Sequence, residues 1–225
     1  MDLSVIIPTL NEQENLPAAI ASARAPAVRE IIVVDGGSSD GTTRIAAERA
    51  DRVLHAPRGR AAQMNAGAAV ARGRVLLFLH ADTRLPAGFD AAIIHALTDS
   101  DVIGGRFDVC LLPSSPLLWL TAALMNLRSR LTRIATGDQA MFVRAGVFRE
   151  LGGFEDIPLM EDVALSRALK RRGRIACLRQ QVVASSRRWR QDGVMRTILL
   201  MWTLRFLYFC GVPPHRLQRV YADRR

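Results

Sequence analysis

Short apolar runs alternate with helical patterns along the first hundred residues. Four β-forming residues stand together at 31–34, and similar runs occur at 3–7, 52–55 and 75–79. Between these runs, apolar residues recur three or four positions apart, which is typical of amphipathic helices. Strands buried on both faces read as continuous apolar runs. The order therefore predicts an α/β fold, with a Rossmann-like, mostly parallel sheet and helices on both faces.

The rhythm changes after about residue 100. Strands are predicted over 102–109 and 140–143, and helices over 117–131, 161–171 and 194–209. We predict a single domain over residues 1–190, with one half at about 1–100 and a second half at 101–190 that completes the same fold. An apolar helix and a basic tail are expected to follow over 191–225.

Composition and charge limit the classes of partner. The chain has 225 residues, of which 49% are hydrophobic and 23% charged, enough to bury a sizeable core and too apolar for disorder. Its net charge of +10 comes almost wholly from arginine, whose planar fork suits phosphate recognition. Nucleotides, phosphates, nucleic acid and an anionic membrane surface all remain open as partners.

Two further observations bear on location. The cysteines at 110, 177 and 210 fit neither a zinc site nor a disulfide framework, which favours reduced thiols. No apolar run approaches the roughly 20 residues needed to span a bilayer, and the chain opens directly into a strand. We expect a cytoplasmic protein that is peripheral, at most, at the inner face of the membrane.

The strand at 31–34 ends in a carboxylate, Asp35, followed by Gly36 and Gly37. In open α/β sheets, ligands bind just beyond the carboxyl ends of the strands. Glycines there allow a sharp turn and a close approach of the ligand. Asp35 is thus placed to accept hydrogen bonds from a bound molecule. The alternative is a polar turn whose Ser or Asp caps the next helix.

Two more groups of polar residues can likewise be interpreted either as ligand-binding or as structural. His80 and Asp82 follow the strand at 75–79, and on extended backbone side chains two residues apart point the same way. They suit one divalent cation completed by water and phosphate oxygens, or else a packed histidine and a capping aspartate. Glu161 and Asp162 open a helix, where negative charge is favourable without any catalytic task.

Taken in order, the polar motifs form a specific series. They are PTLNE (8–12), VVDGGSSDGT (33–42), Arg60 with Asn65 and Gly67, LFLHADT (77–83), GDQAMFVR (137–144), GGF (152–154), MED (160–162) and RRW (187–189). This series resembles the family-2 glycosyltransferases, which have the GT-A nucleotide-sugar fold. The closing stretch LRFLYFCGVPPHRLQRVY, together with HADT, is most similar to the radical-SAM/selenodomain-associated transferase 2 (arsenosugar-biosynthesis-type) clade.

The resemblance implies a nucleotide pocket in the first half of the domain. Pro8, Thr9 and Glu12 match the segment that lines it. Asp35 matches the carboxylate that reads the base, with Gly37 in the same loop. The second half, by the same resemblance, holds the acceptor.

The resemblance also implies the reacting groups. Arg60 matches a basic residue near the donor, and Asp82 matches the metal-binding aspartate of the DXD motif, for Mn²⁺ or Mg²⁺. His80 stands where the family has the first aspartate of that motif, a departure that affects the metal. Asp162 matches the general base, supported by Glu161.

One motif matches only in part. Arg188 and Trp189 match the RW of a QxxRW motif that meets donor or acceptor, but Ser185 occupies the glutamine position. Sugar–diphosphate cleavage needs charge stabilisation of the leaving phosphates and one base at the acceptor hydroxyl. A single base opposite the leaving group gives direct displacement, so the expected enzyme is an inverting glycosyltransferase (EC 2.4). UDP is the expected nucleotide only because the family most often uses it.

The acceptor and the further partners stay open. The acceptor half is apolar, which suits a lipid-linked acceptor and a small metabolite equally. The helix at 194–209 is apolar nearly all round, with arginines at 196 and 205. It suits an anionic membrane surface, but also core packing or a homodimer interface.

Three other functions fit less well. A nucleotidyltransferase would carry a Gly-rich, basic loop after the first strand, where this chain has PTLNEQEN. A non-enzymatic membrane- or nucleic-acid-binding protein leaves Asp35, Asp82 and Asp162 without a task, and 6% aromatic residues offer few platforms for base stacking, so no nucleic-acid partner is expected. A nucleotide-binding relative that has lost transferase activity through His80 remains the alternative.

Overall fold

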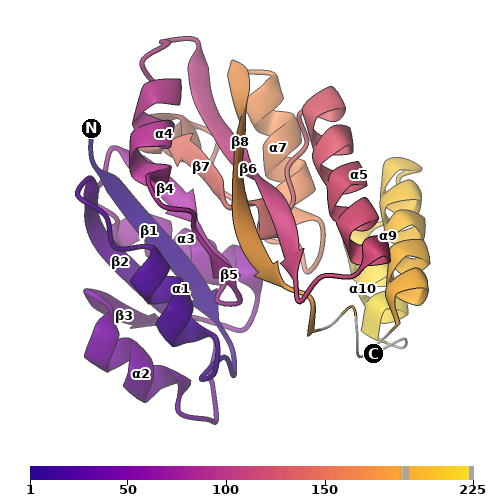
Figure 1. The fold of residues 1–225 in the computed structure, drawn as a ribbon, viewed down its shortest axis with the longest axis horizontal. Coiled ribbons are helices and arrows are strands. Elements are labelled where there is room, and N and C mark those ends of the chain that lie inside the picture. Colours follow the sequence, from indigo (N-terminus) through magenta and orange to yellow (C-terminus); the bar gives the residue numbers. More distant parts are fainter. Residues whose placement is uncertain (188, 190–192, 223–225) are drawn as a thin grey trace.

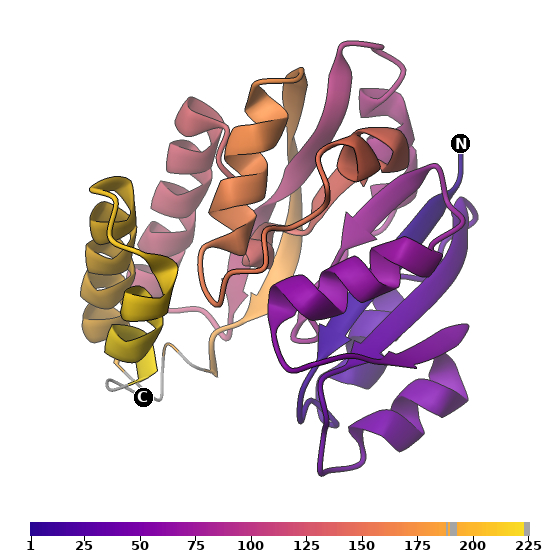
Figure 2. The same cartoon turned by 180° about the vertical axis from the view of Figure 1, so that it is seen from behind.

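A computed structural model of the chain describes residues 1–187, 189 and 193–222. These residues form one eight-stranded sheet with helices on both faces (Figure 1; Figure 2 shows the reverse side). The strand order is β3-β2-β1-β4-β7-β6-β8-β5. The α/β class and the mostly parallel sheet predicted from the sequence are confirmed.

The strands are β1 (Leu3–Thr9), β2 (Val28–Asp35), β3 (Arg52–His55), β4 (Val75–Phe78), β5 (Thr83–Arg84), β6 (Val102–Leu112), β7 (Met141–Arg144) and β8 (Arg174–Ser185). The helices are α1 (Leu16–Ser22), α2 (Thr42–Arg49), α3 (Arg60–Val70), α4 (Phe89–Ala96), α5 (Pro116–Thr132), η1 (Gly137–Gln139), α6 (Ala145–Glu150), α7 (Glu161–Lys170), α9 (Val194–Phe209) and α10 (Pro214–Ala222). All four predicted strands of the first half are present, and β1–β4 pair in parallel.

The sequence did not predict β8 or α4. Strand β8 has 12 residues and pairs with β6, yet most of its side chains are exposed or half-buried. Its apolar signal is therefore weak, since only Val182 and Ala184 are buried. Helix α4 has only 8 residues, and most of them are apolar. Its sequence therefore lacks the alternation of apolar and polar positions that predicts an amphipathic helix.

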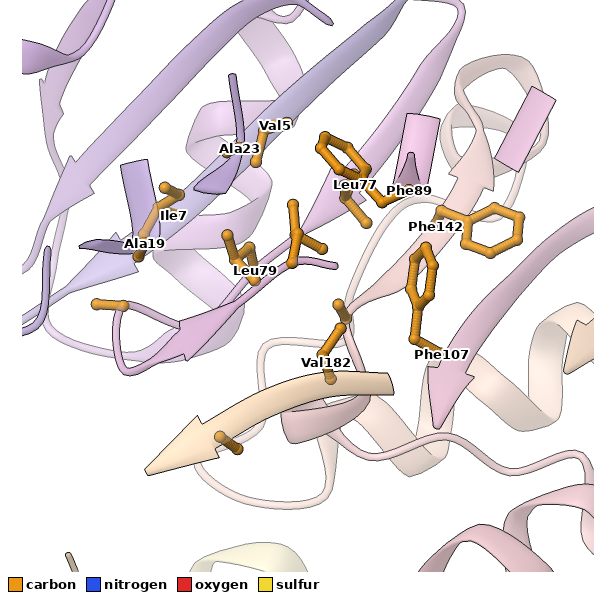
Figure 3. Close-up of a cluster of buried hydrophobic side chains, with 14 of the residues drawn as sticks. Val5, Ile7, Ala19, Ala23, Leu77, Leu79, Phe89, Phe107, Phe142 and Val182 are labelled. Atoms are coloured by element: carbon orange, nitrogen blue, oxygen red, sulfur yellow. The ribbon is translucent and has the colours of Figure 1, made fainter. Parts of the chain in front are cut away.

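Alternate residues of the strands divide the core into two layers. Val5 and Ile7 of β1 lie in the first layer, which α1, α2, α4 and α5 cover (Figure 3). Ile6 points to the second layer, which α3, α6 and α7 cover. This alternation on every central strand is what a sheet buried on both faces requires.

The last two helices form a third apolar cluster. Leu200 and Leu204 of α9 and Leu217 of α10 pack against Met160 and Val163 at the start of α7. Helix α9 also lies beside α5 (Figures 1 and 2). One face of α9 is therefore packed on the fold. No helix within the described residues is long and apolar enough to cross a membrane.

The antiparallel direction of one strand, β7, determines where the candidate site lies. Strand β7 runs antiparallel to β4, with Met141 opposite Phe78. The residues before β7 therefore lie beside those that follow β4. In this way η1, from the second half of the chain, comes to the sheet edge where the parallel strands end.

The close packing of α3 on the sheet generates a stability prediction. A Cβ on Gly67 would lie 2.6 Å from Cγ2 of Ile6 and 3.1 Å from Cγ2 of Val34, both fully buried. We expect Gly67→Ala to lower the free energy of unfolding in urea by about 1–2 kcal/mol, because overpacking exceeds the gain in helix propensity.

The matched control is Gly146→Ala in α6, where no atom lies within 4 Å of the added Cβ. This variant should be neutral or stabilised by up to about 1 kcal/mol. Equal effects of the two substitutions would show that α3 does not approach the sheet this closely.

Candidate active site

The loop after β2 is organised by Asp35. Its side chain is 2% exposed and accepts hydrogen bonds from the backbone N–H groups of Gly37 and Ser38, both at 2.9 Å, and from the Ser38 hydroxyl. Burial alone would raise the pKa of Asp35, but the hydrogen bonds from Ser38 and Gly37 and the nearby His55 lower it below its ordinary value. An ionised Asp35 thus holds the turn and keeps about one acceptor position for a ligand.

The loop after β1 is joined to this turn. Pro8 and Thr9 lie buried at the end of β1, opposite Val34 and Asp35. The side-chain amide of Gln63, on α3, donates to the carbonyl oxygens of Thr9 and Val34, both at 2.8 Å. Gln63 therefore fixes the two strand ends relative to each other. The sequence analysis missed it, because a glutamine inside a helix gives no signal.

The segment after β8 reaches the same loop. Nη2 of Arg187 lies 3.6 Å from Oε2 of Glu12, and Nη1 lies 3.8 Å from Oε2 of Glu14. Trp189 is half-buried against the first core layer. Arg188, its predicted partner, lies outside the described residues. Arg187, which the partial motif did not single out, thus lies at the predicted nucleotide loop.

The turn after β4 carries the predicted metal ligands. Nδ1 of His80 lies 3.3 Å from Oδ1 of Asp138 in η1. The carboxylate of Asp82 accepts one long hydrogen bond, 3.4 Å from the Thr83 hydroxyl, and no other within the described part of the chain. Asp82 is half-buried, so most of its acceptor positions are open to a ligand.

The side chains in this turn suit a cation whose remaining coordination positions are filled by phosphate oxygens of the substrate. Across the described residues, no three His, Cys, Asp or Glu side chains form a metal site by themselves. Mg²⁺ and similar cations commonly take one or two carboxylates plus phosphate oxygens and water. Asp82 fits that role. The expectation that His80 and Asp82 share an extended segment is wrong, because residues 80–83 form a turn closed by a 3.1 Å hydrogen bond from the Thr83 N–H to the His80 carbonyl oxygen, so their spacing alone does not aim both side chains at one ion. The donor set is therefore compatible with Mn²⁺ or Mg²⁺ once a diphosphate is present.

Gly137 connects the histidine to the predicted base. A Cβ on Gly137 would lie 2.2 Å from Cε1 and 2.3 Å from Nε2 of His80, so a larger residue there would force the imidazole ring to move. Its backbone N–H donates to Oδ2 of Asp162 at 2.8 Å. The sequence analysis quoted GDQ without giving it a role, because a contact between residues so far apart in sequence leaves no local pattern.

The two acidic residues that open α7 differ in environment. Asp162 is half-buried, and its Oδ1 accepts the backbone N–H of Val163 at 2.7 Å. Glu161 is 5% exposed. Burial, and then the charge of Asp162, raise the pKa of Glu161 above its ordinary value of 4.5, with Arg60 and His80 opposing the rise.

Arg60 faces these carboxylates from the start of α3. The side chain is exposed to solvent, yet surrounding protein partly desolvates it. That desolvation is outweighed by electrostatic interactions with Glu161, Asp138, Tyr221 and Asp162, in this order, which together raise the pKa of Arg60. The structure therefore brings Arg60, His80, Glu161 and Asp162 together, with Asp138 as a member that was not predicted. Thr9 and Glu12, at the end of β1 and in the loop after it, and Asp35, at the end of β2, lie in the two loops that Gln63 joins.

Two relatives and one solved structure are similar to this chain. An uncharacterized glycosyltransferase of Mycobacterium bovis is 33% identical over 106 residues, which are 46% of this chain and 48% of that protein. The PGL/p-HBAD biosynthesis glycosyltransferase of M. bovis strain BCG is 34% identical over 164 residues, 67% of this chain and 62% of that protein. The chain thus spans about half of the first relative's length.

The structural likeness covers more of the chain. Glucosyl-3-phosphoglycerate synthase from Mycobacterium tuberculosis, in complex with Mn²⁺, UDP and glucosyl-3-phosphoglycerate, matches with a TM-score of 0.66. The match covers 94% of this chain and 81% of that one, at 19% sequence identity. At this identity the likeness shows the fold alone, which is the GT-A fold that the motifs predicted.

Residues 4–149, more than half of the chain, match the family described as Glycosyl transferase family 2. The matched region runs from β1 into α6 and includes Asp35, Asp82 and Gly137. On this evidence the chain belongs to glycosyl transferase family 2.

Proposed function

We propose that the protein transfers a sugar from a nucleotide-diphosphate donor to an acceptor hydroxyl by direct displacement with inversion. The observation that carries the proposal is the link through Gly137, which places Asp162 beside His80 at the strand ends that carry Asp82. The structural likeness to a synthase solved with UDP and Mn²⁺ supports the donor class.

On the donor side, the chain supplies positive charge and an oriented loop. Arg60 is positioned to bind the diphosphate, and Asp35 holds its loop with an acceptor position left for the base. Asp82, with His80 beside it, would hold a divalent cation, which when bound neutralises charge on the leaving diphosphate. The positive charge of Arg60 would stabilise the leaving diphosphate, because negative charge develops on this group as it leaves.

On the acceptor side, the two carboxylates take different roles. Burial, and then the charge of Asp162, raise the pKa of Glu161, and we assign the role of base to Asp162, the half-buried and more accessible carboxylate of the two. The backbone N–H groups of Gly137 and Val163 fix the orientation of Asp162. Asp162 then takes the proton of the acceptor hydroxyl as it attacks, and Glu161 supports it. With one base and no carboxylate nucleophile, the anomeric configuration inverts.

The finer assignments rest on sequence. UDP is proposed as the nucleotide from family usage, and the closing sequence alone assigns the chain to the radical-SAM/selenodomain-associated transferase 2 clade. The acceptor is a small metabolite or a lipid-linked molecule. The division at residue 190, with α9 and α10 as an appendage, remains part of the proposal. The alternative is a nucleotide-binding relative without transferase activity that binds a membrane surface or nucleic acid.

We also propose that the protein acts at an anionic membrane surface. Helix α9 exposes an apolar stripe at helical spacing, formed by Met195, Leu199, Trp202, Phe206 and Phe209, whose exposure is between 56% and 77%. The neighbouring α5 exposes a similar stripe, formed by Leu120, Leu124, Leu127 and Leu131. The net charge of +10 makes an anionic bilayer the complementary partner.

The donor class is tested by calorimetric titration with UDP and GDP, with and without Mn²⁺. We expect metal-dependent binding of one nucleotide, and that Asp82→Asn weakens it about tenfold or more. Asp162→Asn should bind that nucleotide normally but lose transfer by about 10²–10⁴-fold, since it lacks the base.

The matched control is Asp101→Asn, an exposed aspartate before β6. It should change neither binding nor transfer. If Asp162→Asn retained normal transfer, the assignment of the base would be wrong. If no nucleotide bound at all, both the transferase proposal and its nucleotide-binding alternative would be overturned.

A second prediction concerns the stability of Glu161→Gln. Because the folded state raises the pKa of Glu161 above 4.5, the folded protein binds this proton more tightly than the unfolded chain. The carboxyl group therefore costs stability as pH rises above the unfolded value. Glutamine mimics the neutral form at every pH, so the Tm of the variant relative to wild type should increase from pH 4 to pH 8.

The control for this measurement is Glu150→Gln, at the exposed end of α6. Its Tm difference from wild type should not change with pH in this way. A constant Tm difference for Glu161→Gln would contradict the raised pKa.

Membrane contact is tested by flotation with vesicles. Wild type should bind phosphatidylglycerol vesicles more strongly than phosphatidylcholine vesicles, and the double change Trp202→Ser with Phe206→Ser should reduce binding about tenfold or more. If a second copy covers this face instead, wild type would elute as a dimer and the double variant as a monomer, without any effect of vesicles.

A further inference from the structure

The short helix η1 is tied to the place where α5 packs on β6 by two buried side-chain amides. Gln139, the last residue of η1, is fully buried, and Asn126 of α5 is buried as well. Nε2 of Gln139 donates to Oδ1 of Asn126 at 3.4 Å. Oδ1 of Asn126 also accepts the N–H of Val109, and its Nδ2 donates to the Val109 carbonyl oxygen, both at 2.9 Å. Asn126 is therefore anchored to the backbone of β6 and provides a fixed point for η1.

Backbone groups at both ends determine how the two amides are oriented. The two bonds to Val109 require the oxygen of Asn126 to face the Val109 N–H, so the group that Gln139 presents to this oxygen must be its NH2. Oε1 of Gln139 then faces back into η1, where it accepts the N–H of Thr136 at 3.2 Å. The backbone N–H of Gln139 donates to the Thr136 carbonyl oxygen at 2.9 Å. One side chain thus closes the turn of η1 and also joins it to β6.

The segment is bound to α7 at two points. The hydroxyl oxygen of Ser166 accepts the N–H of Ala135 at 3.1 Å, and Asp162 accepts the N–H of Gly137 at 2.8 Å. Residues four positions apart on a helix share a face, so α7 presents both acceptors to the same stretch of backbone. Residues 135–139 therefore lie between α7 on one side and Asn126 on the other. A shift of this stretch would move the amide that orients Asp162.

The backbone next to η1 needs such support. Ala140, which directly follows Gln139, is fully buried and has a φ of 44°, in the left-handed region that is unfavourable for alanine. Met160, two residues before Asp162, has a φ of 72°. Backbone conformations of this kind persist where surrounding contacts hold them, and they concentrate at functional sites. The local sequence alone therefore does not favour this turn, and the hydrogen bonds of Gln139 help to hold it.

We propose that Gln139, anchored by Asn126, is a positioning residue for the transfer step, because it holds η1 where the N–H of Gly137 meets Asp162. This inference rests on the transferase function proposed above and adds a residue that acts on the base through a backbone amide. Since Gln139 is fully buried, its removal should affect the rate of transfer and not the binding of nucleotide.

The test follows hydrogen exchange of the Gly137 amide by NMR in the ligand-free full chain, with the amide of Gly67 inside α3 as the internal reference. Gln139→Met keeps the length of the side chain but loses its hydrogen bonds. We expect the Gly137 amide of this variant to exchange at least tenfold faster than in wild type, relative to Gly67. Asp162→Ala, which removes the acceptor of this amide, gives the exchange rate expected for complete loss of the bond.

A second variant tests whether Gln139 acts through Asn126. Asn126→Leu should also speed exchange of the Gly137 amide, and the double variant with Gln139→Met should exchange no faster than the faster of the two single variants. Two side chains that contribute one shared interaction are not additive, whereas independent ones are. Additive effects would show that Gln139 holds η1 without Asn126.

The matched control is Gln63→Met, the same change at another buried glutamine that joins two segments. It should leave exchange of the Gly137 amide as in wild type but weaken UDP binding in the presence of Mn²⁺, since Gln63 joins the predicted nucleotide loops. Gln139→Met should bind UDP as wild type does. Its kcat for transfer should fall by about tenfold to a hundredfold with the donor KM unchanged, because a misplaced base slows the reaction without affecting the bound ground state.

Each other outcome contradicts a stated part of the argument. Unchanged exchange of the Gly137 amide in Gln139→Met, or exchange that increases equally at Gly67, overturns the positioning role. A normal kcat in Gln139→Met overturns it as well, while loss of transfer in Asp162→Asn would still support the base. Absence of nucleotide binding in wild type instead overturns the transferase proposal, whatever the exchange of the Gly137 amide shows.

Discussion

The contact between Gly137 and His80 is the constraint on which the arrangement of the site depends. A side chain at Gly137 would displace the His80 ring from its present position, and the N–H of Gly137 orients Asp162. The contact exists because β7 runs antiparallel to β4, which returns the second half of the chain to the strand ends of the first. His80 and Asp162, which we propose to act on the donor and the acceptor side, are thus set relative to each other by one backbone segment.

Strands and helices that are specified by a short stretch of sequence are predicted well. The strands that became β1–β4 are continuous apolar runs, and α9 begins and ends at the residues expected from its pattern. Strand β8 was missed because it is half-buried and carries arginine and glutamine where a central strand would carry valine. Its place in the sheet comes from pairing with β6, a long-range interaction that no short window contains.

The same division holds for the site. A carboxylate at the end of an apolar strand indicates a loop at the ligand edge, and Asp35 and Asp82 were found in this way. Gln63 and Asp138 were not, because each acts on residues far away in the sequence. A structural and a ligand-binding role of the same residue need not exclude each other. Asp35 holds its own turn through three hydrogen bonds and still retains acceptor capacity.

The two halves of the chain differ in how fully their polar groups are satisfied. In the first half, the loops after β1 and β2 are joined by hydrogen bonds that leave the side chains there paired, as with Gln63 and Asp35. In the second half, Arg106, Arg128 and Ser129 have buried donors that find no acceptor among the residues that the structure describes. Each such donor lacks the hydrogen bond that most buried polar groups make, so this region is less fully paired than the loops after β1 and β2. The half of the chain proposed to bind the acceptor is thus the half whose buried polar groups are less fully paired, whereas the loops proposed to bind the nucleotide are held by the chain's own hydrogen bonds.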